Sequence, residues 1–559
     1  MKKRSFFLFV LAFLFGAKAF GQEWEYTIPF QSSDAEMTRQ YCAYEMSDGR
    51  IIVSASFLFN VGSYSPGYPF YPPHNALVAL SPKGEELAQN FYFKDGYWGS
   101  SYNPYVFENE SGELFMLTTY SPDHESRYFN YFLNYDNPPT DAILGLYKLD
   151  DDLEIVESHE YSFPVDTTLG QSTYDPCESS GSIHLHSAIL DGDCMVGVYT
   201  KNVSKDNDSI HGYDSIFFFR MNFEGELLAN VGYEIPYSGW AWQMVFWREQ
   251  LVPTDYGYIY FNNRSDVPPT PDLTEGTTAY LGGTVCYLDK DFNLLKNRHF
   301  KHPGNPNIPW PFDDMSVIRS KHNTTYLATR SNRHYEQTED DCYLYEFDDD
   351  IEDTQEVVPV LHDIHRGVPD FDFVAECRAV DVADDGSVYF CYSLNVGFSL
   401  ANDSWVVIEK FDENMNIISE VYYGTDDDQI WYCAESITLA RDGGVLMTTH
   451  MKKLANQSQR GSVVVKFPAE AFVGIEEAHD NGLKVAVAYP NPGKDVLNIR
   501  TGLKNAFVEV YDLTGKLIYN QEITENITSI NTENWSNGVC IWKVIADGKE
   551  VESGKWIKE

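Results

Sequence analysis

A unit of short β-strands and tight turns repeats along this chain, and it limits the fold more than any other feature. The clearest copy, Ala379 to Tyr423, contains four strand-like runs, the first two separated by the turn Asp384-Asp385-Gly386. Asp-Gly between β-rich runs is a strong hairpin signal, because glycine adopts positive φ without steric cost. Six other copies are Tyr44 to Leu80, Tyr105 to Phe163, Ser187 to Ile235, Val245 to Phe300, Ser316 to Val360 and Glu435 to Phe467.

The period of the repeat predicts a ring of sheets. From Leu80 in the first copy to Lys466 in the seventh, the units are spaced by roughly 64 residues, longer than the ~40–50 residues of familiar blade repeats. Tandem four-strand units can form an open array or close into a ring, and closure leaves only short, protected edges. Enrichment in Tyr, Phe, Val, Thr and Ile favours all-β structure. We therefore expect an all-β fold with a seven-bladed β-propeller over residues 22–467.

The two ends of the expected propeller complement each other. The last copy ends near Phe467 without a fourth strand, whereas Gln22 to Phe30 (QEWEYTIPF) has the pattern of a fourth strand without a sheet. We expect the N-terminal strand to complete the last blade and so close the ring. The alternative is an unrelated edge strand.

The first 21 residues have the pattern of a secretory signal. Lys2, Lys3 and Arg4 precede an apolar run that is too short to span a bilayer, and Ala17-Lys18-Ala19 offers a small-x-small cleavage site. No later run reaches the ~18 apolar residues of a transmembrane helix. We therefore expect residues 1–21 to be removed and the rest to contain no transmembrane segment.

Charge and cysteine content exclude some functions. The formal net charge of −44 should repel nucleic acids and anionic membranes, so we expect no nucleic-acid partner. The nine cysteines form no CxxC pair, which argues against metal-thiolate sites. Several cysteines lie inside expected strands, where they are best explained as small buried hydrophobic residues. Export would permit disulfides, but the odd number leaves at least one cysteine unpaired.

The composition changes after residue 467. Residues 468–482 have an acidic centre and end in Asn481-Gly482, which is typical of a linker. Residues 483–559 contain short strands separated by turns such as Thr514-Gly515 and Asn537-Gly538. Several strands with turns at short spacing predict a small Ig-like β-sandwich.

Five landmarks in this last module occur in a characteristic order. Tyr489-Pro490-Asn491-Pro492 opens it, followed by VLNI, Val510-Tyr511-Asp512 with Gly515-Lys516, Gly538-Val539 before a strand, and a basic end at Lys555 to Lys558. This order resembles the type-A C-terminal sorting domain of the type IX (Por) secretion system. The resemblance implies export to the periplasm, recognition by the type IX machinery at the outer membrane, and surface attachment or release. The departures are Cys540-Ile541-Trp542, where a Tyr-rich strand is usual, and the terminal Glu559.

Catalytic and metal motifs are weak. The chain has no G-x-S-x-G, H-E-x-x-H or P-loop sequence. His184 and His186 are two apart in an expected strand and would share a face, as a metal pair or as a polar strand face. His362 and His365 would meet only on a helical turn. The Asp289-to-Asn293 turn begins like a calcium loop but lacks the following glycine, so ordinary turn chemistry is the simpler interpretation, with structural calcium as the alternative and no other cofactor expected.

Aromatic loops are the best binding candidates. Their length and proline content place them outside the blade strands, where binding residues tend to lie. Flat aromatic rings with nearby carboxylates and amides suit glycans or peptides, although packing between blades also uses large rings. The candidate ligand-binding residues are Trp98, Tyr131, Trp240 and Trp242.

We therefore expect an exported, cell-surface or secreted binding protein, with a propeller as cargo for a glycan or protein ligand. One alternative is a propeller-type glycoside hydrolase or lyase, whose acids would come from separate blades around the channel. Retaining glycosidases need carboxylates ~5–5.5 Å apart and inverting enzymes ~6.5–9.5 Å apart. A further alternative is a structural surface component.

Overall fold

The computed structural model describes most of the expected strands. The described residues are 22–28, 35–59, 63–65, 68–69, 73–94, 97–99, 104–122, 140–164, 183–201, 215–234, 250–264, 281–299, 312–319, 324–331, 341–347, 359–362, 373–375, 377–394, 405–413, 415–424, 430–453, 460–472, 486–489, 494, 496–501, 503, 506–512, 515–524, 527–536, 538–546 and 548–558. The expected signal sequence, residues 1–21, lies outside them. No helix in these ranges is long and apolar enough to cross a membrane.

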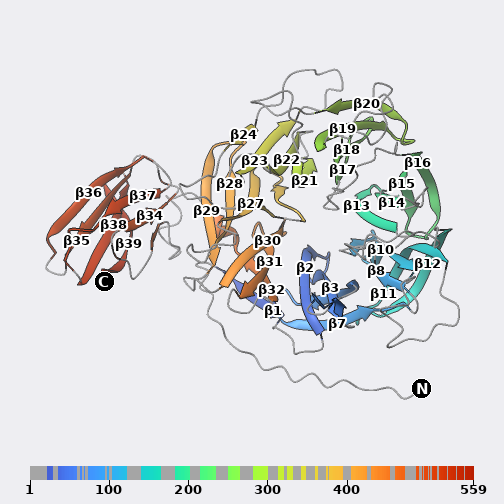
Figure 1. Cartoon of the computed structure of the whole chain (residues 1–559), viewed down its shortest axis with the longest axis horizontal. Coiled ribbons are helices and arrows are strands. Elements are labelled where there is room, and N and C mark those ends of the chain that lie inside the picture. The colour runs from blue at the N-terminus through green and yellow to red at the C-terminus, as the bar shows by residue number, and fades with distance from the viewer. Residues whose placement is uncertain are drawn as a thin grey trace, which may run out of the picture.

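The described part of the chain is all-β, apart from one 3-10 turn, η2 (Ala469–Phe472). Before that turn, its strands form seven antiparallel sheets of four or five strands, which we number sheet 1 to sheet 7 in chain order. Figure 1 shows these sheets arranged around a common centre, as in a propeller, with the last module to one side. Tandem hairpins thus give a propeller-like, all-β body, as the repeat predicts.

The first three sheets each begin with an inner strand and end with an outer strand. Sheet 1 contains β2 (Ala35–Glu45), β3 (Ile51–Phe59), β6 (Pro73–Leu80) and β7 (Glu86–Tyr92), and a small ribbon of β4 (Ser63–Ser65) and β5 (Tyr68–Pro69) lies between β3 and β6 in sequence. Sheet 2 contains β8 (Tyr97–Gly99), β9 (Tyr105–Glu108), β10 (Leu114–Pro122), β11 (Asp141–Leu149) and β12 (Ile155–Pro164). Sheet 3 contains β13 (Ile183–Asp191), β14 (Cys194–Lys201), β15 (Ser215–Asn222) and β16 (Leu227–Glu234).

The next three sheets follow the same order. Sheet 4 contains β17 (Gln250–Pro253), β18 (Gly257–Arg264), β19 (Leu281–Asp289) and β20 (Leu294–His299). Sheet 5 contains β21 (Phe312–Arg319), β22 (Thr325–Ser331), β23 (Asp341–Phe347) and β24 (Pro359–His362). Sheet 6 contains β25 (Phe373–Val374), β26 (Val380–Val382), β27 (Val388–Leu394), β28 (Trp405–Phe411) and β29 (Ile417–Gly424).

Sheet 7 takes its outer strand from the other end of the chain. It contains β30 (Ile430–Leu439), β31 (Val445–Lys453), β32 (Arg460–Phe467) and, beside β32, β1 (Trp24–Ile28). The pairing is antiparallel and runs from Trp24 opposite Lys466 to Ile28 opposite Ser462. β1 also reaches sheet 1, because the indole Nε1 of Trp24 donates to the carbonyl of Pro82 at 2.9 Å. The N-terminal strand therefore pairs with the last sheet, as the sequence predicts, and it also contacts the first sheet.

A five-residue turn with a side-chain cap joins the two outer strands in most sheets. At Asp289 the carboxylate accepts hydrogen bonds from the amides of Asp291 and Asn293, at 2.9 and 2.8 Å. The fourth residue of the turn has positive φ and is Phe292 here, with φ of 64°. Its side chain is fully buried, as is that of the equivalent Leu153. Burial in the gap between sheets offsets the strain of a non-glycine residue in this conformation.

Tyrosines on outer strands hydrogen-bond to these turns in the next sheet. The hydroxyl of Tyr161 in sheet 2 donates to the carbonyl of Gly225 in sheet 3 at 2.7 Å and accepts from the amide of Leu227 at 2.8 Å. Tyr233 makes the same pair of bonds to Phe292 and Leu294, and Tyr92 donates to Leu153 at 2.8 Å. We call these three tyrosines the tyrosine latches.

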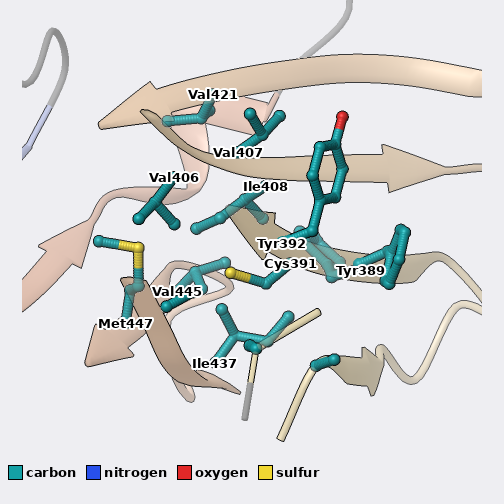
Figure 2. Close-up of a cluster of buried hydrophobic side chains, with 14 of the residues drawn as sticks. Tyr389, Cys391, Tyr392, Val406, Val407, Ile408, Val421, Ile437, Val445 and Met447 are labelled. Atoms are coloured by element: carbon teal, nitrogen blue, oxygen red, sulfur yellow. The ribbon is translucent and has the colours of Figure 1, made fainter. Parts of the chain in front are cut away.

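Apolar side chains fill the gaps between neighbouring sheets. The largest described cluster joins sheets 5, 6 and 7, and Figure 2 shows Cys391, Ile408, Ile437 and Met447 meeting there. The 3-10 turn η2 belongs to this body, since the Phe472 ring centroid lies 5.3 Å from that of Tyr389. The chain therefore leaves the body beside sheet 6, five residues beyond the expected end of the propeller.

The antiparallel order gives the ring two unequal faces. Alternate connections leave opposite ends of a sheet. On one face, which we call the turn face, the described connections are short, such as 46–50, 81–85 and 150–154. On the opposite face, the loop face, several connections are much longer and include 123–140 and 235–249.

The C-terminal module has two facing sheets. One contains β33 (Val487–Tyr489), β34 (Val496–Arg500) and β37 (Ile527–Asn531), and the other contains β36 (Leu517–Ile523), β35 (Ala506–Tyr511), β38 (Gly538–Ala546) and β39 (Lys549–Lys558), in the order β36-β35-β38-β39. Their buried faces share one core that includes Leu497, Val508, Trp542 and Trp556.

Candidate functional site

One candidate binding residue can be placed on the loop face. Trp98 lies in β8 and pairs with Ser121 near the end of β10, where the chain enters connection 123–140. Its backbone is therefore at the loop-face end of sheet 2. The side chain of Trp98 lies outside the described residues.

The other aromatic candidates belong to connections that start and end on the same face. Tyr131 is within connection 123–140 of sheet 2, and Trp240 and Trp242 are within connection 235–249 between sheets 3 and 4. All three lie outside the described residues. What the structure adds is the position of the strand ends that flank them.

A second candidate site lies where the inner strands of sheets 6, 7 and 1 approach each other. It brings together six side chains that are distant in sequence, and we call it the inner cluster. Its members are Cys42, Tyr44, Cys377, Arg378, Glu435 and His450.

Glu435 is the centre of the inner cluster. It is fully buried at a bulge of β30, where Ala434 pairs with Thr449 and Ser436 pairs with Thr448. Bulges often redirect a side chain next to a functional site. The carboxylate oxygen Oε1 lies 2.5 Å from Nδ1 of His450 in the same sheet.

Sheet 6 packs directly against this bulge. The backbone amide of Cys377 donates to the carbonyl of Glu435 at 2.5 Å, and the Cys377 thiol lies 3.9 Å from the second carboxylate oxygen, Oε2. Arg378 and Ser436 form a parallel bridge, so the inner strands of sheets 6 and 7 run in the same direction. Two adjacent sheets thus share one buried carboxylate.

The charges around the inner cluster are partly compensated. Burial acts to lower the pKa of Arg378, but the Asp381 carboxylate, 2.8 Å from the guanidinium, raises it overall. Burial raises the pKa of Tyr44 well above its usual value, and the nearby Cys42 raises it further. Near neutral pH the cluster therefore presents a cation and neutral phenol around Glu435 and His450, a combination that can hold a polar ligand or transfer a proton.

The two histidines of sheet 3 lie close together, and His186 interacts with a residue of its own sheet. The ring centroids of His184 and His186 are 6.5 Å apart. A bulge between Leu185 and Ser187 interrupts the pairing at His186, whose Nε2 lies 2.6 Å from the hydroxyl of Thr200. Burial lowers the pKa of His186 to about 3, so the ring is neutral. Across the described ranges, no group of three or more His, Cys, Asp or Glu residues could hold a metal ion.

The structure describes part of the other histidine pair and the Asp289 turn. His362 is the last residue of strand β24 (Pro359–His362), and His365 lies outside the described residues. In the Asp289 turn, the carboxylate oxygens accept from the amides of the turn and from the Asn293 side chain at 2.9 Å. The hydrogen bond from Asn293 lowers the pKa of Asp289. Hydrogen bonds within the turn thus explain why an aspartate occupies position 289.

The cysteines among the described residues form no disulfide, and most are buried. Cys177 lies outside these ranges. The exception to full burial is Cys377 of the inner cluster, which is partly exposed.

The sorting-motif residues occupy turns and strand ends of the C-terminal module. Gly515 has φ of 81°, and Lys516 donates its amide to Asp512, as in the capped turns of the ring. Gly538 starts β38 and pairs with Lys558. Tyr489 ends β33, with its side chain outside the described residues, as are Pro490, Asn491 and Pro492.

The sequence contains a signal for the inner cluster that motif reasoning misses. The inner strands of sheets 1 and 7 carry the similar runs YCAYE at 41–45 and YCAES at 432–436, and sheet 6 carries ECRAV at 376–380. A Cys-Ala or Cys-Arg-Ala run thus occurs in three neighbouring sheets, and two of its cysteines, Cys42 and Cys377, belong to the inner cluster. Which side chain is buried at the centre follows only from the bulge at Glu435.

Comparison with known proteins identifies the C-terminal module. Residues 487–559 match the family model described as "Secretion system C-terminal sorting domain". The chain therefore carries a type IX secretion sorting domain, and the protein is exported to the cell surface or secreted. Interaction with the type IX machinery follows from this domain. No curated protein sequence matches the chain.

Solved structures similar to this chain include the following three. A protein of unknown function from Bacteroides caccae is 11% identical with a TM-score of 0.33, covering 62% of this chain and 89% of its own. PorZ from Porphyromonas gingivalis, described as a surface component of the type IX secretion system, is 9% identical with a TM-score of 0.21, covering 95% and 100%. The α-L-arabinofuranosidase Arb93A from Fusarium graminearum is 10% identical with a TM-score of 0.36, covering 74% and 99%. At this level of similarity, none of them assigns a function to the ring.

Proposed function

We propose that this protein is a cell-surface or secreted binding protein whose seven-bladed β-propeller holds a glycan or protein ligand on its loop face. The C-terminal sorting domain delivers this cargo across the outer membrane. The observation that carries the proposal is the position of Trp98 in β8, at the loop-face end of sheet 2. Tyr131, Trp240 and Trp242 belong to connections of that same face. Aromatic side chains offer flat, amphipathic contact surfaces suited to sugars and peptides.

The proposed domain boundaries are a signal at 1–21, a propeller at 22–467, a linker at 468–482 and an Ig-like sorting sandwich at 483–559. Pairing of β1 with β32 supports a ring closed by its N-terminal strand. Packing of Phe472 against Tyr389 supports moving the start of the linker beyond η2.

Glycan and peptide arrays test the binding proposal. Trp98→Ala should lower the affinity for the ligand by about tenfold or more, as removal of a central aromatic contact does. Leu87→Ala is the matched control, because this side chain is 53% exposed at the turn-face end of β7 and should not affect binding. Failure of the wild-type ring to bind any glycan or peptide would overturn the proposal.

Export has its own test. Deleting residues 483–559 should trap the protein in the periplasm, whereas ligand binding by the trapped protein should be unchanged. Normal surface display of the deletion variant would contradict the role of the domain in this chain.

A propeller-type glycoside hydrolase or lyase is the second candidate, and the inner cluster supports it. Glu435 is a buried carboxylate beside His450, and general acid–base chemistry uses such pairs. The test measures release of reducing ends and of unsaturated products from a polysaccharide panel. Glu435→Gln should reduce any turnover by about 10²-fold or more, while Trp98→Ala should weaken substrate binding. Turnover unaffected by Glu435→Gln would eliminate the inner cluster as the active site.

A further inference from the structure

In the described part of the chain, a cation–π pair joins the sorting domain to the propeller body. The guanidinium carbon of Arg500, at the end of β34, lies 4.7 Å from the centroid of the Tyr422 ring in β29. A cation within about 6 Å of a ring centroid is attracted to the face of that ring. The contact joins the outermost strand of sheet 6 to the middle strand of the smaller sheet of the sorting domain.

Arg500 is buried although its side chain points away from the core of its own domain. Leu497 and Ile499 point into the core of the sandwich. Residues alternate between the two faces of a strand, so Val496 and Arg500 point away from that core. Val496 is 41% exposed, whereas Arg500 is only 6% exposed. The Tyr422 ring lies where it can account for this difference.

On the propeller side of the contact, the surroundings of Tyr422 are suited to a cation. The hydroxyl of Tyr422 donates to the carboxylate of Glu420, two residues earlier on the same strand face, at 2.9 Å. The electron-rich face of the phenol and a carboxylate therefore lie next to each other. The adjacent Tyr423 points to the opposite side of β29, into the core of the propeller. Its hydroxyl lies 3.2 Å from the carboxylate of Glu25, and its side chain packs between sheets 6 and 7.

The segment that connects the propeller to the sorting domain is short enough to keep the domain near sheet 6, but long enough that the contact is not imposed by the connection. The body ends at Phe472, which packs against sheet 6, and the sorting domain begins at Ala486. Residues 473–485 can span at most about 45 Å when fully extended. A tether of this length keeps the domain at millimolar effective concentration near sheet 6, so a small contact surface is enough to hold it.

We infer that the sorting domain docks on the outer strand of sheet 6 through Arg500 and Tyr422, so that cargo and sorting domain are presented to the secretion machinery in one defined orientation. Docking uses the sheet β33-β34-β37 and leaves the sheet β36-β35-β38-β39 turned away from the ring (Figure 1). That free sheet carries the exposed side chains of Phe507 and Leu517.

Docking is independent of ligand binding on the loop face. Tyr422 is on the outermost strand of sheet 6, whereas Trp98 is at the loop-face end of sheet 2. Loss of the Arg500 contact should leave glycan or peptide binding unchanged, and loss of ligand binding should leave docking unchanged. The two proposals therefore fail separately.

Single-molecule energy transfer on the chain spanning residues 22–559 tests docking. Dyes attached through non-natural residues at the exposed positions Glu413 and Glu533 report the distance between sheet 6 and the sorting domain. The wild type should give one narrow, high-efficiency population. Arg500→Ala and Tyr422→Ala should each raise the undocked fraction about fivefold, the change expected for loss of one cation–π contact, and the double variant should raise it no further.

Three further variants separate docking from damage to the fold. Asn498→Ala lies on the same outward face of β34 and should not change the distance distribution. Tyr422→Phe keeps the ring, and Arg500→Lys keeps the cation, so both should remain largely docked. Tyr422→Ala alters the propeller and leaves the sorting domain unchanged. It therefore still tests docking if Arg500→Ala unfolds the sorting domain. A broad wild-type population, or a distribution unchanged in Tyr422→Ala, would overturn docking.

Discussion

The indole of Trp24 lies directly over Gly84. A Cβ atom built at position 84 would come within 2.5 Å of the Trp24 ring, and Gly84 has φ of 78°. Trp24 is in the closing strand β1, and Gly84 is in the outer turn of sheet 1. The meeting point of the two ends of the ring therefore depends on the absence of a side chain at one position.

Gly84→Ala should lower the free energy of unfolding by about 2–4 kcal/mol, because it adds a steric clash to the strain of a left-handed alanine. Gly192→Ala is the matched control, since Gly192 also has positive φ, 64°, but no atom lies near its Cβ position. It should cost only about 1 kcal/mol. Urea unfolding of both variants measures the difference, and equal costs would mean that the Trp24 contact does not constrain Gly84.

The tyrosine latches predict a second effect on stability. Tyr161→Phe keeps the ring but removes the hydroxyl that bonds to Gly225 and Leu227 in the next sheet. The loss should cost about 1–3 kcal/mol, because two backbone groups at a sheet interface lose their partner. Tyr519→Phe, whose hydroxyl bonds to Gln521 at an exposed site of the sorting domain, should change stability by less than about 0.5 kcal/mol. Thermal unfolding that does not distinguish the two variants would contradict a role for the latches.

The sequence predicts the sheets well because their signals are local. Turn residues such as Asp412 and Gly386 and the alternation of the flanking strands act within about ten residues. The pairing of β1 with β32 can also be predicted from the sequence. The last repeat unit lacks a fourth strand, and the N-terminal strand belongs to no other unit. The inner cluster is not readable in this way. Cys42, Cys377 and Glu435 meet only because the ring brings sheets 1, 6 and 7 together, and the burial of Glu435 depends on a one-residue bulge.

The aromatic candidates show a different limit. Their loop composition predicts exposure and binding, but composition cannot tell which face of a ring a loop leaves. The antiparallel strand order supplies that information for Trp98, whose strand β8 is paired at the loop-face end of β10. In the same way, spacing placed His184 and His186 on one strand, but it could not reveal the bulge at His186 that ties that ring to Thr200.

Burial of His186 predicts a pH dependence of stability. Its pKa is about 3 in the folded protein, against a usual value of 6.5. Between these values the unfolded chain binds the additional proton, so the contribution of His186 to stability is complete above pH 6.5 and is lost as the pH falls toward 3. Lowering the pH from 7 to 5 should cost about 2 kcal/mol from this group alone.

His186→Gln tests that contribution, because glutamine can hydrogen-bond to Thr200 but does not titrate. The loss of stability between pH 7 and pH 5, measured by urea unfolding, should be smaller in the variant by about 2 kcal/mol. The carboxylates titrate in both proteins and cancel in the comparison. Parallel pH profiles would show that the His186 ring accepts a proton without cost.

Folding of the sorting domain should limit export. Trp556 is fully buried in its core, with its ring centroid 6.1 Å from that of Trp535 in an edge-to-face arrangement. Trp556→Ala should cost about 3–5 kcal/mol, a large part of the stability of so small a domain. The variant should accumulate in the periplasm, which fractionation and surface labelling measure. Ser553→Ala, an exposed position on the same strand β39, should be displayed normally. Full surface display of a variant whose sorting domain is shown to be unfolded would mean that the machinery reads the sequence of this domain rather than its fold.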